Sequence, residues 1–406
     1  MPPPAHNSSC ARIFGRMNTA RTSLLTRNIW LLSLVSLFND VATEMLYPVM
    51  PVYLKSIGFS VAFIGVLEGF AEALAGLSKG YFGNWSDVSG RRRPFVQVGY
   101  ALSAVSKPIL AWFVQPAAVF LARTGDKLGK GVRTAARDAL LSDEATPETK
   151  GRVFGFHRSM DTLGAVFGPL LALLYLYRHP SAYATLFAWA ILPGMLAVAV
   201  TLLIRERRKA RREDAARPGW LDFVQYWKRS PAAYRRLATA LLVFALFNSS
   251  DVFLLLKVRE AGFSDAALIG AYIFFNLIFA AAAYPLGALA DRLGMKRVFA
   301  AGLVLFAVTY AGMAFAGTWG SFLVLFGCYG LYAAATDGVA KAWISNISDQ
   351  QDTATAIGTY TAFQSVATLL ASSLAGLLWV WAGPAAVFGL SAVAAAGVAF
   401  FLIKRV

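Results

Sequence analysis

Apolar segments of about 20 residues alternate with short polar stretches along almost the whole chain. A helix of about 20 apolar residues is long enough to span the hydrocarbon core of a bilayer. The pattern therefore predicts an all-α polytopic membrane protein with twelve transmembrane helices, six on each side of a longer polar stretch. The predicted spans are 28–54, 61–83, 94–114, 117–140, 151–177, 182–204, 237–259, 265–289, 297–316, 320–345, 354–377 and 380–403.

An internal repeat relates the two groups of spans. Residues 83–93 read GNWSDVSGRRR, and residues 287–297, which lie 204 positions later, read GALADRLGMKR. A fixed internal period indicates that one structural unit occurs twice. We therefore expect four parts: a tail at 1–27, a six-helix bundle at 28–204, a linker at 205–236 and a second six-helix bundle at 237–406.

The composition agrees with a membrane protein, because 57% hydrophobic and 15% charged residues are too apolar for a soluble domain of 406 residues. The net charge of +16 would also suit a nucleic-acid partner, but arginine and lysine are concentrated in alternate loops. Eleven of them lie in the linker at 205–236. This bias predicts a cell (inner) membrane protein with both termini and the linker in the cytoplasm, and it argues against nucleic-acid binding.

The polar ends of the chain and the linker carry weaker signals. Residues 1–27 lack the apolar core of a secretory signal, so we expect a cytoplasmic tail, with an arginine-rich transit peptide as the alternative. The linker has Trp220, Phe223 and Trp227 at helical spacing, which predicts either a short helix in the membrane interface or a solvated linker. The two cysteines form no metal or disulfide pattern, and we expect no cofactor.

Charged residues inside the spans are concentrated in the first half. Each costs about 2.5–3.5 kcal/mol at the centre of a span, so such residues indicate function. The first six spans contain Asp40, Glu44, Glu68, Glu72, Lys79, Lys107, Arg123, Asp126, Lys127, Lys130, Arg133, Arg137, Asp138, Arg158 and Asp161. The last six contain Asp251, Lys257, Asp337 and Lys341. The fifteen charges of the first half would cost on the order of 40 kcal/mol if unpaired, so they must pair or line water.

The spacing of these charges predicts rows that face one another. Positions in 123–137 follow the i, i+3, i+4, i+7 rule, which places a cationic stripe on one face of the fourth span. Asp40 and Glu44 share a face of the first span, and Glu68 and Glu72 share a face of the second. We expect a polar cavity in the first half; the alternative is an ion-pair lattice with a structural role only.

The fifth span contains Gly164, Gly168 and Pro169, and the first contains Pro48 and Pro51. Glycine permits close contact between helices, and proline removes a backbone hydrogen bond. These residues predict bends in both spans.

The repeated loop phrase, the six-plus-six layout and the basic linker together resemble the major facilitator superfamily of secondary transporters, from about residue 28 to the end of the chain. The resemblance implies two six-helix bundles related by a pseudo-two-fold axis along the membrane normal, with the substrate site at their interface. The family's loop motif joins the two halves on the cytoplasmic side. Its positions are Gly83, Asp87, Gly90, Arg91 and Arg92, with Gly287, Asp291 and Gly294 in the second copy.

The same resemblance implies contacts for this motif. Asp87 would lie at the amino terminus of span 11, where the helix dipole favours an anion, and Arg91 would pair with Asp138. The phrase Gly164-Ala-Val-Phe-Gly168-Pro169 resembles the span-5 motif of proton antiporters that export drugs and metabolites, although a later glycine of that motif is absent.

Proton-coupled transport requires a carboxylate that gains and loses a proton as the cavity changes side. We assign proton coupling to acids near the bilayer midplane, namely Asp40, Glu72, Asp126 and Asp161. We assign substrate binding to Glu44, Glu68, Lys107, Arg123, Lys127, Lys130, Asp251 and Asp337. The cationic stripe predicts a small-molecule substrate with an anionic or zwitterionic group.

The predicted function is secondary active transport of that small molecule by a monomer in the lipid bilayer, coupled to protons, with export favoured over uptake. The alternatives are a multidrug/proton antiporter, which the 14% aromatic content would suit, a proton-coupled uptake carrier, and a passive facilitator or sensor. A membrane enzyme is disfavoured, because His157 is the one histidine in the predicted spans and no nucleophile or metal motif accompanies it.

Overall fold

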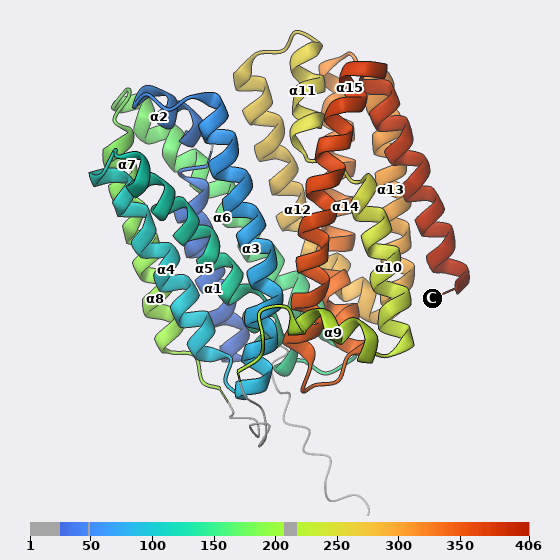
Figure 1. The fold of residues 1–406 in the computed structure, drawn as a ribbon. Coiled ribbons are helices and arrows are strands. Elements are labelled where there is room, and N and C mark those ends of the chain that lie inside the picture. The colour runs from blue at the N-terminus through green and yellow to red at the C-terminus, as the bar shows by residue number, and fades with distance from the viewer. Residues whose placement is uncertain (1–24, 48, 207–216, 406) are drawn as a thin grey trace, which may run out of the picture.

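A computed structural model describes residues 25–47, 49–206 and 217–405 of the chain. The expected tail up to residue 24, Pro48, residues 207–216 and Val406 lie outside the described residues. The described residues form helices joined by turns, with no strand among them. Two groups of long helices stand side by side (Figure 1).

The first group consists of eight helices. They are α1 (Arg27–Glu44), α2 (Met50–Ser56), α3 (Val61–Ser89), α4 (Arg93–Trp112), α5 (Pro116–Asp143), α6 (Lys150–Arg178), α7 (Tyr183–Trp189) and α8 (Ile191–Leu202). A short helix of the linker, α9 (Asp222–Arg229), follows. The second group consists of α10 (Ala232–Phe247), α11 (Val252–Glu260), α12 (Asp265–Leu293), α13 (Met295–Phe315), α14 (Trp319–Ile347) and α15 (Thr353–Arg405).

Each predicted span corresponds to one helix or to a helix interrupted at one point. Spans 1, 6 and 7 are interrupted, between α1 and α2, at Ala190 between α7 and α8, and at 248–251 between α10 and α11. The interruptions of spans 1 and 7 occupy equivalent positions of the 204-residue repeat. Spans 11 and 12 are the two parts of α15, which divides at Gly383. The φ of +81° at Gly383 is a conformation that glycine adopts without steric cost.

Seven helical stretches among the described residues are long and apolar enough to cross a membrane: 150–178, 183–202, 232–260, 267–293, 295–315, 319–347 and 353–405. The predicted spans outside this set are α1 with α2, α3, α4 and α5. These are the helices that carry most of the charged residues of the first half. The all-helical, two-bundle fold predicted from the sequence is confirmed.

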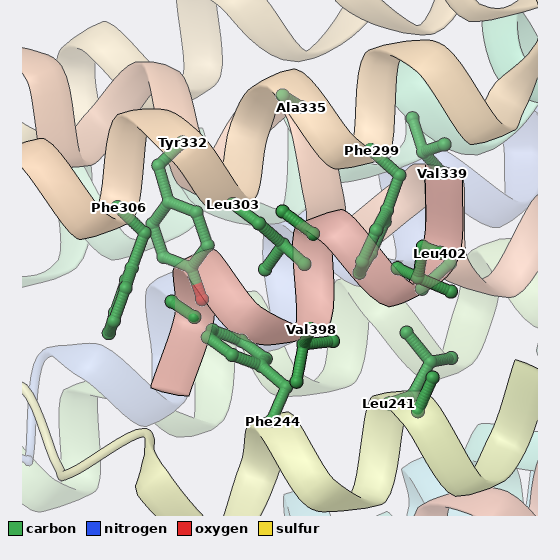
Figure 2. Packing of buried hydrophobic residues seen from close by; sticks show 14 of the residues in the cluster. Leu241, Phe244, Phe299, Leu303, Phe306, Tyr332, Ala335, Val339, Val398 and Leu402 are labelled. Carbon is green, nitrogen blue, oxygen red and sulfur yellow. The ribbon is translucent and has the colours of Figure 1, made fainter. Parts of the chain in front are cut away.

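The two bundles have different interiors. The second bundle has an apolar core in which Phe244, Phe299, Leu303 and Phe306 pack with Tyr332 (Figure 2). Between α3, α4, α5 and α6 of the first bundle, buried charged residues such as Lys107, Arg123 and Asp138 replace part of such a core. Buried charges persist only when they are paired or hydrated, so the buried charged residues of the first bundle require partners or water.

The linker helix α9 packs against both bundles at one end of the molecule (Figure 1). Phe223 is buried over α3, and its carbonyl oxygen accepts a hydrogen bond of 3.1 Å from Thr359 Oγ1 of α15. Trp220 packs on Tyr81 of α3 with ring centroids 4.6 Å apart. This part of the linker is therefore a packed helix and not a solvated connection. We call the end of the molecule with α9 the linker side and the opposite end the far side.

Candidate functional site

Two cations of the stripe on α5 are neutralised by acids on the neighbouring helix α3. Arg123 makes a bidentate ion pair with Glu68 of α3, with hydrogen bonds of 2.7 and 2.8 Å. Lys127, one turn further, pairs with Glu72 of the same helix. The i, i+4 spacing of the two acids on α3 matches the i, i+4 spacing of the two cations on α5. The predicted facing rows of α3 and α5 thus exist, and they consist of direct ion pairs.

Asp126 of α5 pairs with a cation of α4. Its carboxylate lies 3.1 Å from the ammonium nitrogen of Lys107 on α4 and also accepts a hydrogen bond from Ser103. The Lys107 side chain is 2% exposed, and it donates further hydrogen bonds to the carbonyl and hydroxyl oxygens of Ser103. This pair fastens α4 to α5 inside the first bundle.

Lys130 differs from the other lysines of the stripe. Its side chain is exposed, and no hydrogen bond or ion pair involving it is found among the described residues. Helix α1, which contacts α5, carries the acids Asp40 and Glu44. Asp40 accepts a hydrogen bond of 3.2 Å from Asn39, and one carboxylate oxygen of Glu44 is buried without a hydrogen-bond partner. An uncommitted cation on α5 and two acids without an ion pair on α1 therefore remain among the described residues.

A second ion-pair network lies toward the linker side and joins the two bundles. Asp138 of α5 is fully buried and contacts both Arg137, at 2.9 Å, and Lys341 of α14, at 2.7 Å. Arg158 of α6 contacts Asp161 at 2.8 Å and Asp337 of α14 at 3.1 Å. Two of these four contacts cross from the first bundle to the second.

The first copy of the loop motif is also a contact between bundles. The buried carboxylate of Asp87 accepts hydrogen bonds from the backbone N–H of Thr355, at 2.7 Å, and from its hydroxyl, at 2.9 Å. Thr355 lies in the first turn of α15, which is the predicted start of span 11. Arg92 contacts the other oxygen of Asp87 at 2.7 Å, and it also pairs with Asp143. The carboxylate is thus fixed by a cation on one side and by a helix amino terminus on the other.

The predicted pair between Arg91 and Asp138 is wrong. The side chain of Arg91 is exposed, whereas Arg92 is 3% exposed and occupies the position beside the motif aspartate. Gly90 ends α3 in the left-handed conformation, with φ of 63°, and this turn directs the second arginine, not the first, toward the protein interior. Asp138 pairs with Lys341 instead.

The second copy of the motif makes the pseudo-symmetric contact. Asp291 of α12 accepts hydrogen bonds from the backbone N–H groups of Gly151, at 2.7 Å, and Arg152, at 2.9 Å. These residues form the first turn of α6, in the first bundle. Each motif aspartate therefore caps a helix of the opposite bundle, Asp87 at span 11 and Asp291 at span 5.

Glycines let the helices meet closely at these two crossings. A Cβ atom on Gly287 of α12 would lie 2.2 Å from the carbonyl oxygen of Gly151, and one on Gly83 of α3 would lie 2.6 Å from that of Ala354. Both distances are shorter than any van der Waals contact, so the linker side is closed by direct backbone packing. No hydrogen bond or ion pair among the described residues joins the two bundles on the far side.

Gly164 and Gly168 of α6 have a related role within the first bundle. Added Cβ atoms would lie 2.8 Å from Leu37 O and from Met45 N of α1, respectively. Helix α6 continues through Pro169 to Arg178. The predicted motif in span 5 is therefore a close-packing surface against α1.

A cavity of about 220 Å³ lies on the inner side of the second bundle. Asp251, at the interruption of span 7, accepts a hydrogen bond of 2.5 Å from the hydroxyl of Tyr329. Asn248 donates to the Tyr332 hydroxyl at 3.3 Å, and Asp337 also lines the cavity. The predicted acids Asp251 and Asp337 are therefore brought to one polar cavity.

The residues that also line this cavity but were not predicted from the sequence are Asn248, Tyr329, Tyr332, Tyr360 and Gln364. They carry no net charge, so a search for charged residues inside spans does not find them. The interruption at 248–251 was a usable signal, because a polar sequence such as Asn248-Ser-Ser-Asp251 favours turns over helix.

Comparison with known proteins connects this arrangement to one family. The family model of the Major Facilitator Superfamily matches residues 32–280 and 259–406. An uncharacterized MFS-type transporter of Methanocaldococcus jannaschii is 29% identical over 361 residues, covering 87% of this chain and 89% of the relative. An uncharacterized protein of Mycobacterium tuberculosis is 32% identical over 228 residues, covering 52% of this chain and 54% of that relative.

Solved structures share the fold at low sequence identity. The human organic anion transporter MFSD10 superimposes with a TM-score of 0.80 and 17% identity, covering 93% of this chain and 99% of that protein. The fucose:proton symporter FucP of E. coli superimposes with a TM-score of 0.74 and 16% identity, covering 93% and 98%. At these identities the likeness concerns the fold alone.

Proposed function

Because the chain belongs to the Major Facilitator Superfamily, and is therefore a membrane transporter and not an enzyme, we propose that it moves a small molecule with an anionic or zwitterionic group by alternating access. We propose further that transport is coupled to protons and that export is favoured over uptake. The linker side would face the cytoplasm of a cell membrane, as the concentration of arginine and lysine in the linker suggests.

The observation that carries this proposal is the position of Lys130. Arg123 and Lys127, the preceding cations of the stripe, are each held by a carboxylate of α3 at ion-pairing distance. Lys130 continues the same stripe, is exposed and has no direct partner among the described residues. A cation available to solvent next to fixed ion pairs is suited to bind an anionic group, and the acids Asp40 and Glu44 of α1 are suited to an ammonium group.

The four carboxylates assigned to proton coupling differ in whether a cation is already paired with them. Glu72 is paired with Lys127, Asp126 with Lys107, and Asp161 with Arg158. A proton competes poorly with a cation that is fixed beside the carboxylate. Asp40 contacts the Asn39 amide and no cation at ion-pairing distance among the described residues. We therefore propose Asp40 as the principal proton carrier, with the other three as candidates of lower rank.

Export rests on the resemblance of the span-5 phrase to that of proton antiporters. A multidrug/proton antiporter, an uptake carrier and a passive facilitator are distinguished from the proposed exporter by the transport assay below. Purified protein is first screened by thermal shift against metabolites and drugs at two pH values, because a ligand that binds the folded state raises its melting temperature.

The ligands found are then tested with Lys130→Gln. If the anionic group binds at Lys130, loss of a charge-assisted contact of about 1.5–3 kcal/mol weakens binding by about tenfold to 100-fold. Lys257→Gln is a matched control, because Lys257 lies in the last turn of α11 outside the stripe. Equal affinity of the Lys130→Gln variant and the parent protein for every anionic ligand would contradict the proposed site.

Proton coupling is tested in proteoliposomes with Asp40→Asn, Glu72→Gln, Asp126→Asn and Asp161→Asn as single variants. Asp40→Asn should lose accumulation of substrate driven by a pH gradient and keep exchange of labelled for unlabelled substrate, because exchange requires no net proton movement. If all four variants still concentrate substrate with normal pH dependence, protons couple elsewhere. A parent protein that only equilibrates substrate would be a facilitator.

A further inference from the structure

An apolar groove of about 680 Å³ lies on the surface of the first bundle. Helix α1 packs against both α6 and α8, and the groove runs between these two helices with α1 as its floor. The side chains of Val41 and Met45 on this floor are buried. We call this feature the surface groove and define it by Val41, Phe167, Leu174, Arg178, Trp189 and Leu196.

The two walls of the surface groove are rows of exposed apolar side chains. Phe167, Leu171 and Leu174 follow the i, i+4, i+7 spacing and therefore share one face of α6. Trp189, at the end of α7, and Leu192 of α8 belong to the opposite wall. These five residues are between 47% and 57% exposed. A hydrocarbon chain in the groove would therefore cover apolar surface on two walls and a floor.

The far-side end of the surface groove is cationic. Arg178, in the last turn of α6, continues the row of that helix, and its side chain is exposed. His179 follows it and also lines the groove. No ion pair of Arg178 is found in the described part of the chain, and no acid is among the described residues that line the groove. The loops at 57–60, 113–115 and 179–182, on the far side of the first bundle, also contain no acid that could pair with Arg178.

The length of the surface groove matches one leaflet of a bilayer. Arg178 follows Phe167 by eleven positions of α6, which corresponds to about 16 Å of helix. The hydrocarbon core of a bilayer is about 30 Å thick, so one leaflet contributes about 15 Å. Tyr177, which is 86% exposed beside Arg178, belongs to a residue type that is enriched where the membrane meets water. These observations place Arg178 at the level of the lipid headgroups and Phe167 near the bilayer centre.

From this match of charge and length we propose that the surface groove binds a phospholipid with a net negative headgroup. Its phosphate lies at Arg178 and His179, and one acyl chain follows the groove toward Phe167. A guanidinium forms charge-assisted hydrogen bonds with a phosphate, whereas the quaternary ammonium of a neutral phosphatidylcholine competes with Arg178 for the same phosphate. The groove includes neither Lys130 nor the cavity with Asp251, so this site goes beyond the proposed transport function.

The test is photo-cross-linking from one position of the purified full-length protein. The protein is reconstituted in vesicles of equal parts phosphatidylglycerol and phosphatidylcholine, both with palmitoyl and oleoyl chains. Leu174, which is 57% exposed on the wall of the groove, is replaced by p-benzoylphenylalanine. This residue reacts on illumination with C–H bonds of a neighbouring acyl chain, and mass spectrometry identifies the lipid that is attached.

The cross-linked lipid should be enriched about fivefold in phosphatidylglycerol, which is the preference that one arginine near the membrane surface supplies. Arg178→Gln removes the charge and should reduce the enrichment to less than twofold. Arg259→Gln is the matched control, because Arg259 is an exposed arginine in the last turn of α11 in the second bundle, and it should leave the enrichment unchanged. The same photo-reactive residue at Val393 of α15, which is 72% exposed outside the groove, should capture the two lipids in equal amounts.

Each variant is first shown to melt at the temperature of the parent protein. The proposal is overturned if position 174 captures the two lipids equally in the parent protein or if Arg178→Gln keeps the enrichment. It is also overturned if the cross-link joins two copies of the chain, because the groove would then be an interface between proteins. None of these results affects the test of Lys130 with anionic ligands, so failure of this proposal and failure of the proposed function can be told apart.

Discussion

Replacement of Asp87 by asparagine tests whether the loop motif closes the linker side. The carboxylate of Asp87 has one oxygen on the backbone and hydroxyl of Thr355 and the other on Arg92. Asparagine has one acceptor oxygen, and its NH₂ group can only donate. Whichever way the amide turns, it presents donors either to the donors of Thr355 or to the guanidinium of Arg92.

The expected cost follows from the contacts that cross between the bundles. Two hydrogen bonds to Thr355 change from charge-assisted to neutral, and the stabilisation that each contributes falls by about 1 kcal/mol. The anion at the amino terminus of α15 is also lost, which contributes about 0.3–1 kcal/mol. The conformation with a closed linker side should therefore be destabilised by about 2–3 kcal/mol relative to the conformation with an open one. The ratio of their populations should shift about 30- to 150-fold. An open conformation that is populated to about 1% in the parent protein would reach a population comparable with that of the closed one.

The assay is the rate at which a maleimide reagent modifies Ser345→Cys in a background with Cys10→Ser and Cys328→Ser. Ser345 is 3% exposed, and its carbonyl oxygen accepts a hydrogen bond from Lys150 of the opposite bundle, so it becomes accessible when the linker side opens. Asp87→Asn should raise the rate at least tenfold and leave ligand binding detectable. Arg91→Ala is the matched control and should not raise it, because the Arg91 side chain is exposed. An unchanged rate in the folded Asp87→Asn variant would refute the assignment of the motif as a closing contact.

Three further predictions concern the linker side, the helix α9 and the topology of the chain. Gly287→Leu should hold the linker side open, because even a Cβ at this position would lie 2.2 Å from the carbonyl oxygen of Gly151. The rate of maleimide modification of Ser345→Cys should rise. A rate equal to that without Gly287→Leu would show that α6 and α12 can pack without this glycine. Phe223→Ala should lower the melting temperature, since truncation of a buried phenylalanine costs about 3–5 kcal/mol of stability. Leu221→Ala, at an exposed position two residues earlier, should have little effect. Equal melting temperatures of the two variants would mean that the packing of α9 on α3 and α15 does not stabilise the protein. Ala215→Cys should react with an impermeant maleimide only after the cells are opened, and labelling of intact cells would reverse the predicted topology.

The sequence by itself determined the number, length and order of the spans, because these depend on local properties. Runs of apolar residues set the span lengths, and the 204-residue repeat related the two bundles. The helical period also predicted that the acids of α3 would face the cations of α5, since i, i+4 positions lie on one face of a helix. The contact of Asp87 with the first turn of span 11 was expected from the family resemblance, and the structure has this contact.

Only the tertiary structure decided which of several adjacent or similar groups meet. Arg91 and Arg92 are equivalent in the sequence, and the left-handed turn at Gly90 determines which of them is buried beside Asp87. Lys127 and Lys130 also belong to one stripe, yet Lys127 finds Glu72 and Lys130 remains exposed, because the distance to a neighbouring helix depends on how the helices pack. The pocket of about 380 Å³ between the bundles arises in the same way: its walls come from α1 and α6 of the first bundle and from α11 and α12 of the second, and the sequence pattern of one helix holds no information about the surface of another.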